Sequence, residues 1–173
     1  GARDVADLAI GDMVVTRDHG LQPIRWVGKR TVPAMGNLAP IRFAPNAVGN
    51  DRELLVSPQH RMLIQGSQSS LMFGESEVLA TAKHLVNGSS VVEQHGGEVT
   101  YVHIMFDQHE IVYAEGAASE SFFPGGTGLD AVEAKAREEM FELFPELRSH
   151  EGSYGDTARI CLKSHESRLL RLA

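Results

Sequence analysis

Short apolar stretches, separated by turn-forming residues, follow one another along roughly the first 120 residues of the chain. They are rich in Val and Ile and are bounded by Gly, Pro and Asn, a pattern that is typical of β-strands. The longer stretch at 100–113 has room for two strands or one bent strand. The other predicted strands cover residues 13–16, 24–27, 54–56, 61–64 and 91–92. This part of the sequence therefore predicts a mainly β fold.

Apolar residues return at helical spacing after residues 123–126, which read Phe-Pro-Gly-Gly and break the strand pattern. A helix is predicted to begin at Asp130, with Glu133 as its capping partner. Its end is predicted near Phe144, because Pro145 interrupts the pattern. The apolar face of this helix would comprise Ala136, Met140, Leu143, Phe144 and Leu147.

A second helix is predicted over residues 158–172, with an apolar stripe that includes Cys161. We interpret Cys161 as a small buried hydrophobic residue rather than a catalytic one. Together these patterns predict a β domain over residues 1–123 and a helical extension over residues 124–173 that packs on it.

A weak internal repeat runs through the β part. Residues 7–14 and 84–91 share Leu, Gly and Val at corresponding positions. A His-Gly pair follows each unit, with His19 after the first and His95 after the second. Duplication would predict two related halves about a pseudo-two-fold axis, with both histidines as structural turn residues. The alternative is a coincidence between two common turn signals.

The composition is globular: of 173 residues, 42% are hydrophobic and 23% charged, which excludes a disordered, collagen-like or coiled-coil chain. No apolar stretch approaches the roughly 20 residues that span a bilayer. Sixteen Lys and Arg against 23 Asp and Glu give a formal net charge of −7, so neither nucleic acid nor an anionic membrane is an expected partner. The chain has one cysteine and eight histidines, so any chemistry is expected to use imidazole, hydroxyl and carboxylate groups.

The first candidate for chemistry is the segment from Ser57 to His60, which follows a predicted strand and contains Pro58. Because proline fixes a turn, a hydroxyl and an imidazole three positions apart can point the same way. The hydroxyl would hold a peptide group while the imidazole transfers a proton. The alternative is a turn-capping serine beside a surface histidine, and spacing alone favours it.

The second candidate is the predicted strand at residues 101–110, in which alternate side chains share a face. His103, Met105, Asp107 and His109 would lie on one side and the apolar residues between them on the other. An imidazole and a carboxylate on that side could form a proton-transfer pair. A metal site that includes His60 is the weaker alternative, because no HExxH or Cys/His signature supports it, and no metal or cofactor is predicted. An ordinary half-exposed strand is at least as compatible with the spacing.

Taken in order, these segments resemble the hedgehog/intein (Hint) family, and specifically its bacterial Hint-type domains. Residues 5–16 are similar to the stretch after the first splicing motif, and residues 57–60 resemble the Thr-x-x-His motif with Ser in place of Thr. Residues 79–88 resemble the second unit of the duplicated fold, and residues 109–116 a late motif in which a His precedes a turn. The resemblance covers residues 2–123 and implies a horseshoe of two pseudo-two-fold-related β halves.

The resemblance implies autoprocessing, with the chain's own upstream polypeptide as the substrate. In such domains a Cys or Ser attacks the preceding carbonyl, and the resulting ester or thioester is then cleaved or transferred. The resemblance assigns stabilisation and protonation of the departing amide to Ser57 and His60. It assigns supporting roles as acid, base or orienting groups to His109 and Asp107, while His103 is a candidate from the strand pattern.

Two departures from the family pattern qualify this expectation. The pattern places the nucleophile before Gly1, so the chain as given is expected to be inactive on its own. Inteins end this block with His-Asn, whereas Glu120 and Ser121 occupy the corresponding positions here. Because Ser cannot cyclise to a succinimide, we expect N-terminal cleavage or transfer without splicing. The alternatives are a Hint scaffold kept as a folding or interaction module and, with less support, a metal-dependent hydrolase.

Overall fold

Short antiparallel strands make up most of the described part of the chain. The computed structural model describes residues 1–124, 138, 141–142, 145, 148 and 154–172. Its strands are β1 (Met13–Thr16), β2 (Gly20–Pro23), β3 (Trp26–Pro33), β4 (Ile41–Phe43), β5 (Leu54–Val56), β6 (Arg61–Gln65), β7 (Glu77–Thr81), β8 (Val91–Glu93), β9 (Glu98–Met105), β10 (Ile111–Ala114) and β11 (Ala117–Glu120). The helices are α1 (Ser67–Phe73) and α3 (Ser164–Ser167), and the 3₁₀ turns are η1 (Val5–Asp7), η2 (Gly36–Leu38) and η3 (Ala82–Leu85).

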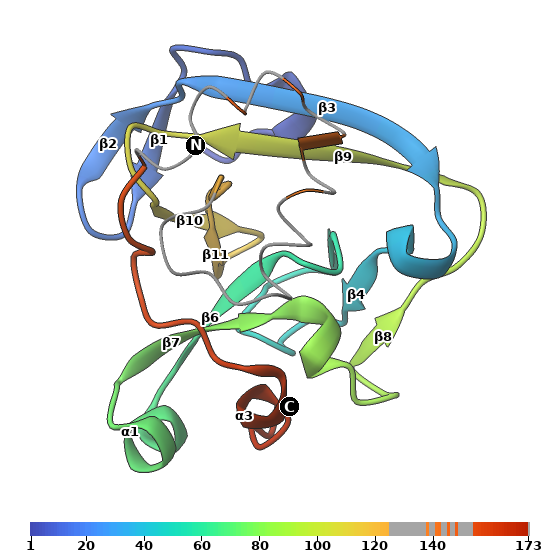
Figure 1. The fold of residues 1–173 in the computed structure, drawn as a ribbon, viewed down its shortest axis with the longest axis vertical. Helices are drawn as coiled ribbons and strands as arrows, with labels where there is room; N and C mark the ends of the chain where they lie inside the picture. The colour runs from blue at the N-terminus through green and yellow to red at the C-terminus, as the bar shows by residue number, and fades with distance from the viewer. Residues whose placement is uncertain (125–137, 139–140, 143–144, 146–147, 149–153, 173) are drawn as a thin grey trace.

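The strands form small antiparallel sheets rather than one continuous layer. The orders are β1-β2, β3-β9, β5-β4-β8 and β10-β11-β6-β7. The two longest strands, β3 and β9, pair along their whole length and arch over β10 and β11 (Figure 1). The mainly β architecture predicted from the sequence is therefore confirmed.

The predicted strands agree with the structure in most places and differ in two. The stretch at 100–113 contains two strands, β9 and β10, which is one of the two predicted alternatives. The strand predicted to stop before Gly28 continues through it to Pro33, because its backbone pairs with β9 over that whole length. Strands β2, β4, β7 and β11 were not predicted, since each is short and contains at most one Val or Ile.

The internal repeat has a structural counterpart. The unit before β1 contains η1 and then Gly11 at φ 90°, and the unit before β8 contains η3 and then Gly88 at φ 76°. Both glycines occupy the left-handed region, where a side chain is disfavoured. The strand that follows leads in each case to a Gly with positive φ, and β3 of the first unit pairs with β9 of the second. The order of local elements therefore occurs twice, as two related β halves require.

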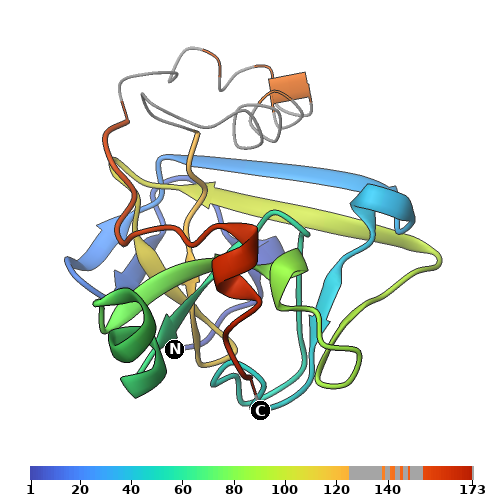
Figure 2. The same cartoon turned by 60° about the horizontal axis from the view of Figure 1, so that its bottom comes forward.

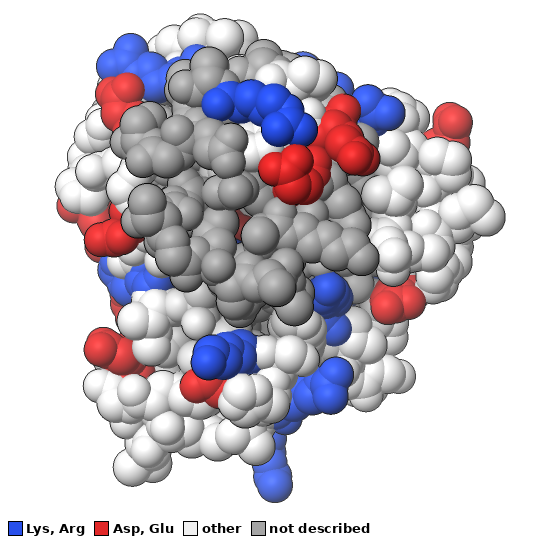
Figure 3. Space-filling view, in the orientation of Figure 1, with Lys and Arg blue, Asp and Glu red and all other residues white. Residues whose placement is uncertain are grey.

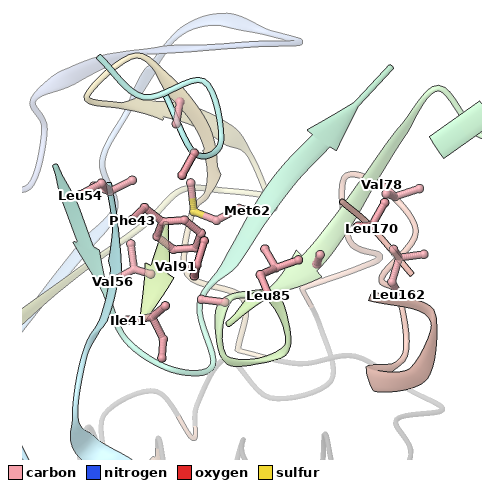
Figure 4. Close-up of a cluster of buried hydrophobic side chains, with 14 residues drawn as sticks. Ile41, Phe43, Leu54, Val56, Met62, Val78, Leu85, Val91, Leu162 and Leu170 are labelled. Atoms are coloured by element: carbon pink, nitrogen blue, oxygen red, sulfur yellow. The ribbon is translucent and has the colours of Figure 1, made fainter. Parts of the chain in front are cut away.

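The main apolar core lies between the sheet that contains β4 and the sheet that contains β6 and β7. Phe43, Met62 and Val91 are fully buried at its centre (Figure 4). Leu162 and Leu170, from the end of the chain, complete the same cluster beside Val78 (Figure 4). A cluster around Ile24 and the two clusters around Met105 and Leu79 are smaller.

The C-terminal residues are less helical than the sequence predicts. In place of a helix over 158–172, only α3 is helical, and residues 160–162 run alongside β7. The hydrogen bonds from Leu79 N to Ile160 O and from Leu162 N to Leu79 O, both 2.8 Å, explain the extended conformation. Helix α3 then lies against β7 and η3 (Figure 2). The helix predicted from Asp130 to Phe144 lies mostly outside the described residues, although Phe141 is buried against Met105.

Within the described ranges, none of the helices combines the length and the apolarity needed to cross a bilayer. Acidic and basic side chains are interspersed over the described surface that Figure 3 presents.

Candidate functional site

The turn before β6 presents His60 at the start of that strand. His60 N donates to Ser57 O at 3.0 Å, which closes the turn around Pro58. Two further backbone bonds tie this turn to η3, from Lys83 N to Pro58 O at 3.0 Å and from Ala82 N to His60 O at 2.8 Å. These bonds fix the direction of His60, and Ser57 is partly buried in the same turn.

Strand β11 lies beside β6 and adds two polar residues to the site. The register opposes Ser119 to Met62, so Ser119 and Glu120 lie next to His60 and Arg61. Ser119 is buried, and its Oγ lies 2.5 Å from His60 Nε2. We call the set of His60, His103, His109, Ser119 and Glu120 the imidazole cluster.

Glu120 is the carboxylate of the imidazole cluster. Its Oε1 accepts from Arg61 N at 2.9 Å, and its Oε2 lies 3.6 Å from the Arg61 guanidinium and 3.0 Å from His109 Nε2. Burial raises the pKa of this carboxyl, but the Arg61 charge and the His109 hydrogen bond outweigh it and lower the pKa to about 2. Glu120 is therefore ionised at neutral pH, although its side chain is only 9% exposed.

His109 has a hydrogen-bond partner at each ring nitrogen. Nε2 faces Glu120, and Nδ1 accepts from Ala158 N at 2.9 Å. The side chain is fully buried, and its ring centroid lies 5.1 Å from that of Phe123. The strand pattern placed His109 on the same face of one strand as His103, whereas in the structure it lies between β9 and β10 with its side chain in the interior.

His103 lies on β9 among aromatic rings. Its ring centroid is 5.6 Å from that of Phe122 in an edge-on arrangement and 6.5 Å from that of Tyr101. Burial, and then the charge of His60, lower the pKa of His103 to about 4. Burial also lowers the pKa of His60, against an opposing influence from Glu120. Both imidazoles are therefore neutral at pH 7 and can either accept or donate a proton.

Asp107 does not share the surroundings of the imidazole cluster. Strand β9 ends at Met105, so the alternation that would align Asp107 with His103 stops before it. Its carboxylate instead makes a bidentate pair with Arg25, with both contacts at 3.0 Å, and its side chain is 67% exposed. The structure therefore joins three of the predicted histidines and separates Asp107 from them.

Among the residues that the structure describes, no group of three His, Cys, Asp or Glu side chains could hold a metal ion. The imidazole cluster instead resembles a proton-transfer site, with neutral imidazoles beside a fixed carboxylate. Cys161 packs partly buried against the apolar cluster around Leu79, in the structural role that the sequence predicts.

Ser119, Glu120 and Arg61 were not among the site residues predicted from the sequence. The available signal was a polar pair at the end of a small-residue strand, Ala117-Ala118-Ser119-Glu120. That signal has no meaning until the pairing of β11 with β6 is known, and the two strands are separated by more than 50 residues.

Comparison with known proteins gives one match. A protein-family model described as a Hint domain matches residues 1–126. Neither the curated proteins nor the solved structures contain a significant match to the chain.

Proposed function

The chain belongs to the Hint domain family, and from this premise we propose that it is an autoprocessing domain that cleaves its own upstream polypeptide. The observation that carries the proposal is the convergence of His60, His103 and Glu120 from three separate strands or their ends. The family match describes the stretch 1–126 as a whole, whereas the convergence identifies which of its side chains strand pairing brings together.

In the proposed reaction, a Cys or Ser that precedes Gly1 in the natural gene product attacks the carbonyl carbon of its own preceding peptide bond. A bond from sulfur or oxygen to that carbon forms, and the C–N bond breaks. The proton of the attacking group ends on the departing amine, which becomes the new N-terminus of the nucleophile residue. Water or another acceptor then takes the acyl group from the thioester or ester.

His60 is the proposed proton carrier for this step. Its Nε2 is bonded to Ser119, and Nδ1 is the ring nitrogen that we propose faces the scissile amide. A neutral imidazole can hand a proton to the departing nitrogen and recover one from the nucleophile. Ser57, in the same turn, is the proposed hydroxyl that holds the amide in place. His103 is proposed to help exclude water from the site and to remain a weak base there.

The test is to express the gene with its natural upstream segment and to follow the intact mass for a shorter product. We expect cleavage in the parent protein, and a loss of about 100-fold or more in rate for His60→Ala, since a positioned acid–base group contributes about 10²–10⁴-fold. His95→Ala is the matched control, because His95 is an exposed turn residue that pairs with Glu93. The proposal is wrong if no product forms even with added thiol, or if His60→Ala cleaves at the parent rate.

One observation favours a second candidate, a Hint scaffold that serves as a non-enzymatic interaction or folding module. The hydrogen bonds of Ser119, His109 and Glu120 are made within the imidazole cluster and its immediate neighbours, as a purely structural network would be. In that case His60→Ala would lower the free energy of unfolding and nothing else. The absence of a Cys or Ser upstream of Gly1 in the gene would favour this candidate.

A further inference from the structure

We propose that residues 157–162, which lie outside the stretch matched by the family model, are part of the site and lock His109 in one tautomer. His109 then acts as a positioning residue for Glu120, not as an acid or base. We call residues 157–162 the C-terminal strap. The effect on catalysis rests on the proposed function, whereas the tautomer does not.

The C-terminal strap is held to the β domain by contacts of the residues that directly follow Ala158. Arg159 makes a bidentate pair with Asp18, at 2.8 and 3.0 Å, and also contacts Glu77 at 2.7 Å. Leu79 bonds to the strap through both its N–H and its carbonyl, and Cys161 forms a β-bridge to it. These contacts tie the strap to residues that are distant in sequence, Asp18, Glu77 and Leu79. The position of Ala158 is therefore determined by the fold.

The bond from Ala158 to His109 has only one possible direction. A backbone N–H can only donate, so His109 Nδ1 must carry the lone pair that accepts it, over 2.9 Å. The neutral ring then carries its proton on Nε2, which donates to Glu120 Oε2 over 3.0 Å. Usually the tautomer of a histidine is an assignment, but here the donor identity fixes it.

This arrangement removes His109 from direct proton transfer. Protonation at Nδ1 would set two N–H groups against each other and would break the bond to Ala158. Both ring nitrogens are already engaged, the side chain is fully buried, and Phe123 packs on the ring. What His109 can do is donate to Glu120, which in turn holds Arg61 at the start of β6, next to His60. Three hydrogen bonds therefore connect the strap to Arg61, the residue that directly follows His60.

The first test is the ¹⁵N spectrum of the imidazoles in the full chain with its natural upstream segment. His109 is expected to show an unprotonated Nδ1 and a protonated Nε2, as its two hydrogen bonds require. A predominantly Nδ1–H tautomer, or a doubly protonated ring at pH 7, would overturn the proposal. This spectrum does not depend on cleavage. A protein that never cleaves but shows the expected tautomer would contradict the proposed function and still support the proposal that the strap fixes the tautomer of His109.

The second test removes the donor. Ala158→Pro lacks the N–H, and an amide-to-ester replacement at Ala158 removes only that group if the proline variant does not fold. We expect loss of the single His109 tautomer and cleavage slowed by about tenfold, the equivalent of one net hydrogen bond. Leu169→Ala is the control, because Leu169 is 53% exposed and lies outside the strap, so both the spectrum and the rate should be unchanged. Cleavage at the parent rate in the ester variant would show that the strap does not support catalysis.

Discussion

At the scale of single residues, the three histidines of the imidazole cluster differ in what holds their ring nitrogens. His60 is bonded at Nε2 to a buried hydroxyl, and His109 is bonded at both nitrogens. His103 is surrounded mainly by aromatic rings, and its charged form is disfavoured there. The three rings are therefore held in three different ways, and His60, with a described hydrogen bond at Nε2, is the one that we propose as the proton carrier.

The low pKa of His103 predicts a specific dependence of stability on pH. Its pKa is about 4 in the folded protein and about 6.5 in an unfolded chain. Between these values the unfolded chain binds a proton that the folded protein refuses, so stability falls as the pH falls. We expect the free energy of unfolding to drop by on the order of 2 kcal/mol from pH 6.5 to 4, allowing for partial exposure of the ring. A further loss of stability, due to Glu120, follows below about pH 4.5, as its carboxylate is protonated.

Urea unfolding at a series of pH values measures this effect, with His103→Gln as the variant. Both proteins should carry His19→Gln, because a hydrogen bond from Glu110 raises the pKa of His19 and acts in the opposite sense. The slope between pH 6.5 and 4 should be smaller in the variant. Equal slopes in the two proteins would contradict the burial of a neutral His103.

At the scale of elements, the sequence identifies strands where apolar runs are bounded by turn residues, as in β1 and β5. It also identifies His60, His103 and His109 as candidates, because histidines within or beside an apolar strand pattern can be recognised from the sequence alone. It fails for Ser119 and Glu120, whose meaning depends on the pairing of β11 with β6. It fails for Asp107 because a turn, which nothing in the alternation signals, ends β9 two residues earlier.

The turn between β10 and β11 determines where Ser119 and Glu120 lie. Glu115 and Gly116 both have positive φ, 49° and 87°, as a two-residue turn between antiparallel strands requires. A Cβ on Gly116 would lie 2.7 Å from Asp51 Oδ2, so Gly116→Ala meets both backbone strain and a side-chain contact. We expect a loss of about 1–2 kcal/mol in the free energy of unfolding and slower cleavage, as β11 shifts against β6.

Gly88→Ala is the matched control for this substitution. Gly88 has φ 76°, its added Cβ would meet no described atom within 4 Å, and it precedes β8 rather than a strand of the site. Chemical unfolding and single-turnover cleavage should separate the two variants. A Gly116→Ala protein that is no less stable than Gly88→Ala and cleaves equally fast would show that this turn does not set the register of β11.

At the scale of the whole molecule, the stretch matched by the family model is shorter than the part of the chain that packs into the apolar clusters. The match ends at residue 126, but Phe141, Leu162 and Leu170 are buried in the two clusters that contain Met105 and Met62. The salt bridges of Arg159 join the same C-terminal residues to Asp18 and Glu77. The end of the chain is therefore a structural part of the β fold rather than an appendage attached to it.

Two neighbouring leucines test this conclusion within the intact chain. Leu170 is 8% exposed and packs in the main core, whereas Leu169 is 53% exposed. Leu170→Ala should cost about 2–4 kcal/mol of unfolding free energy, the usual range for a buried leucine, and Leu169→Ala less than about 0.5 kcal/mol. Both losses should appear in a single cooperative transition, because the core that Leu170 completes is the core of the β domain. If Leu170→Ala instead unfolds the C-terminal residues alone and leaves the transition of the β domain unchanged, residues 1–126 are an independent unit, and the strap can be removed without loss of the fold.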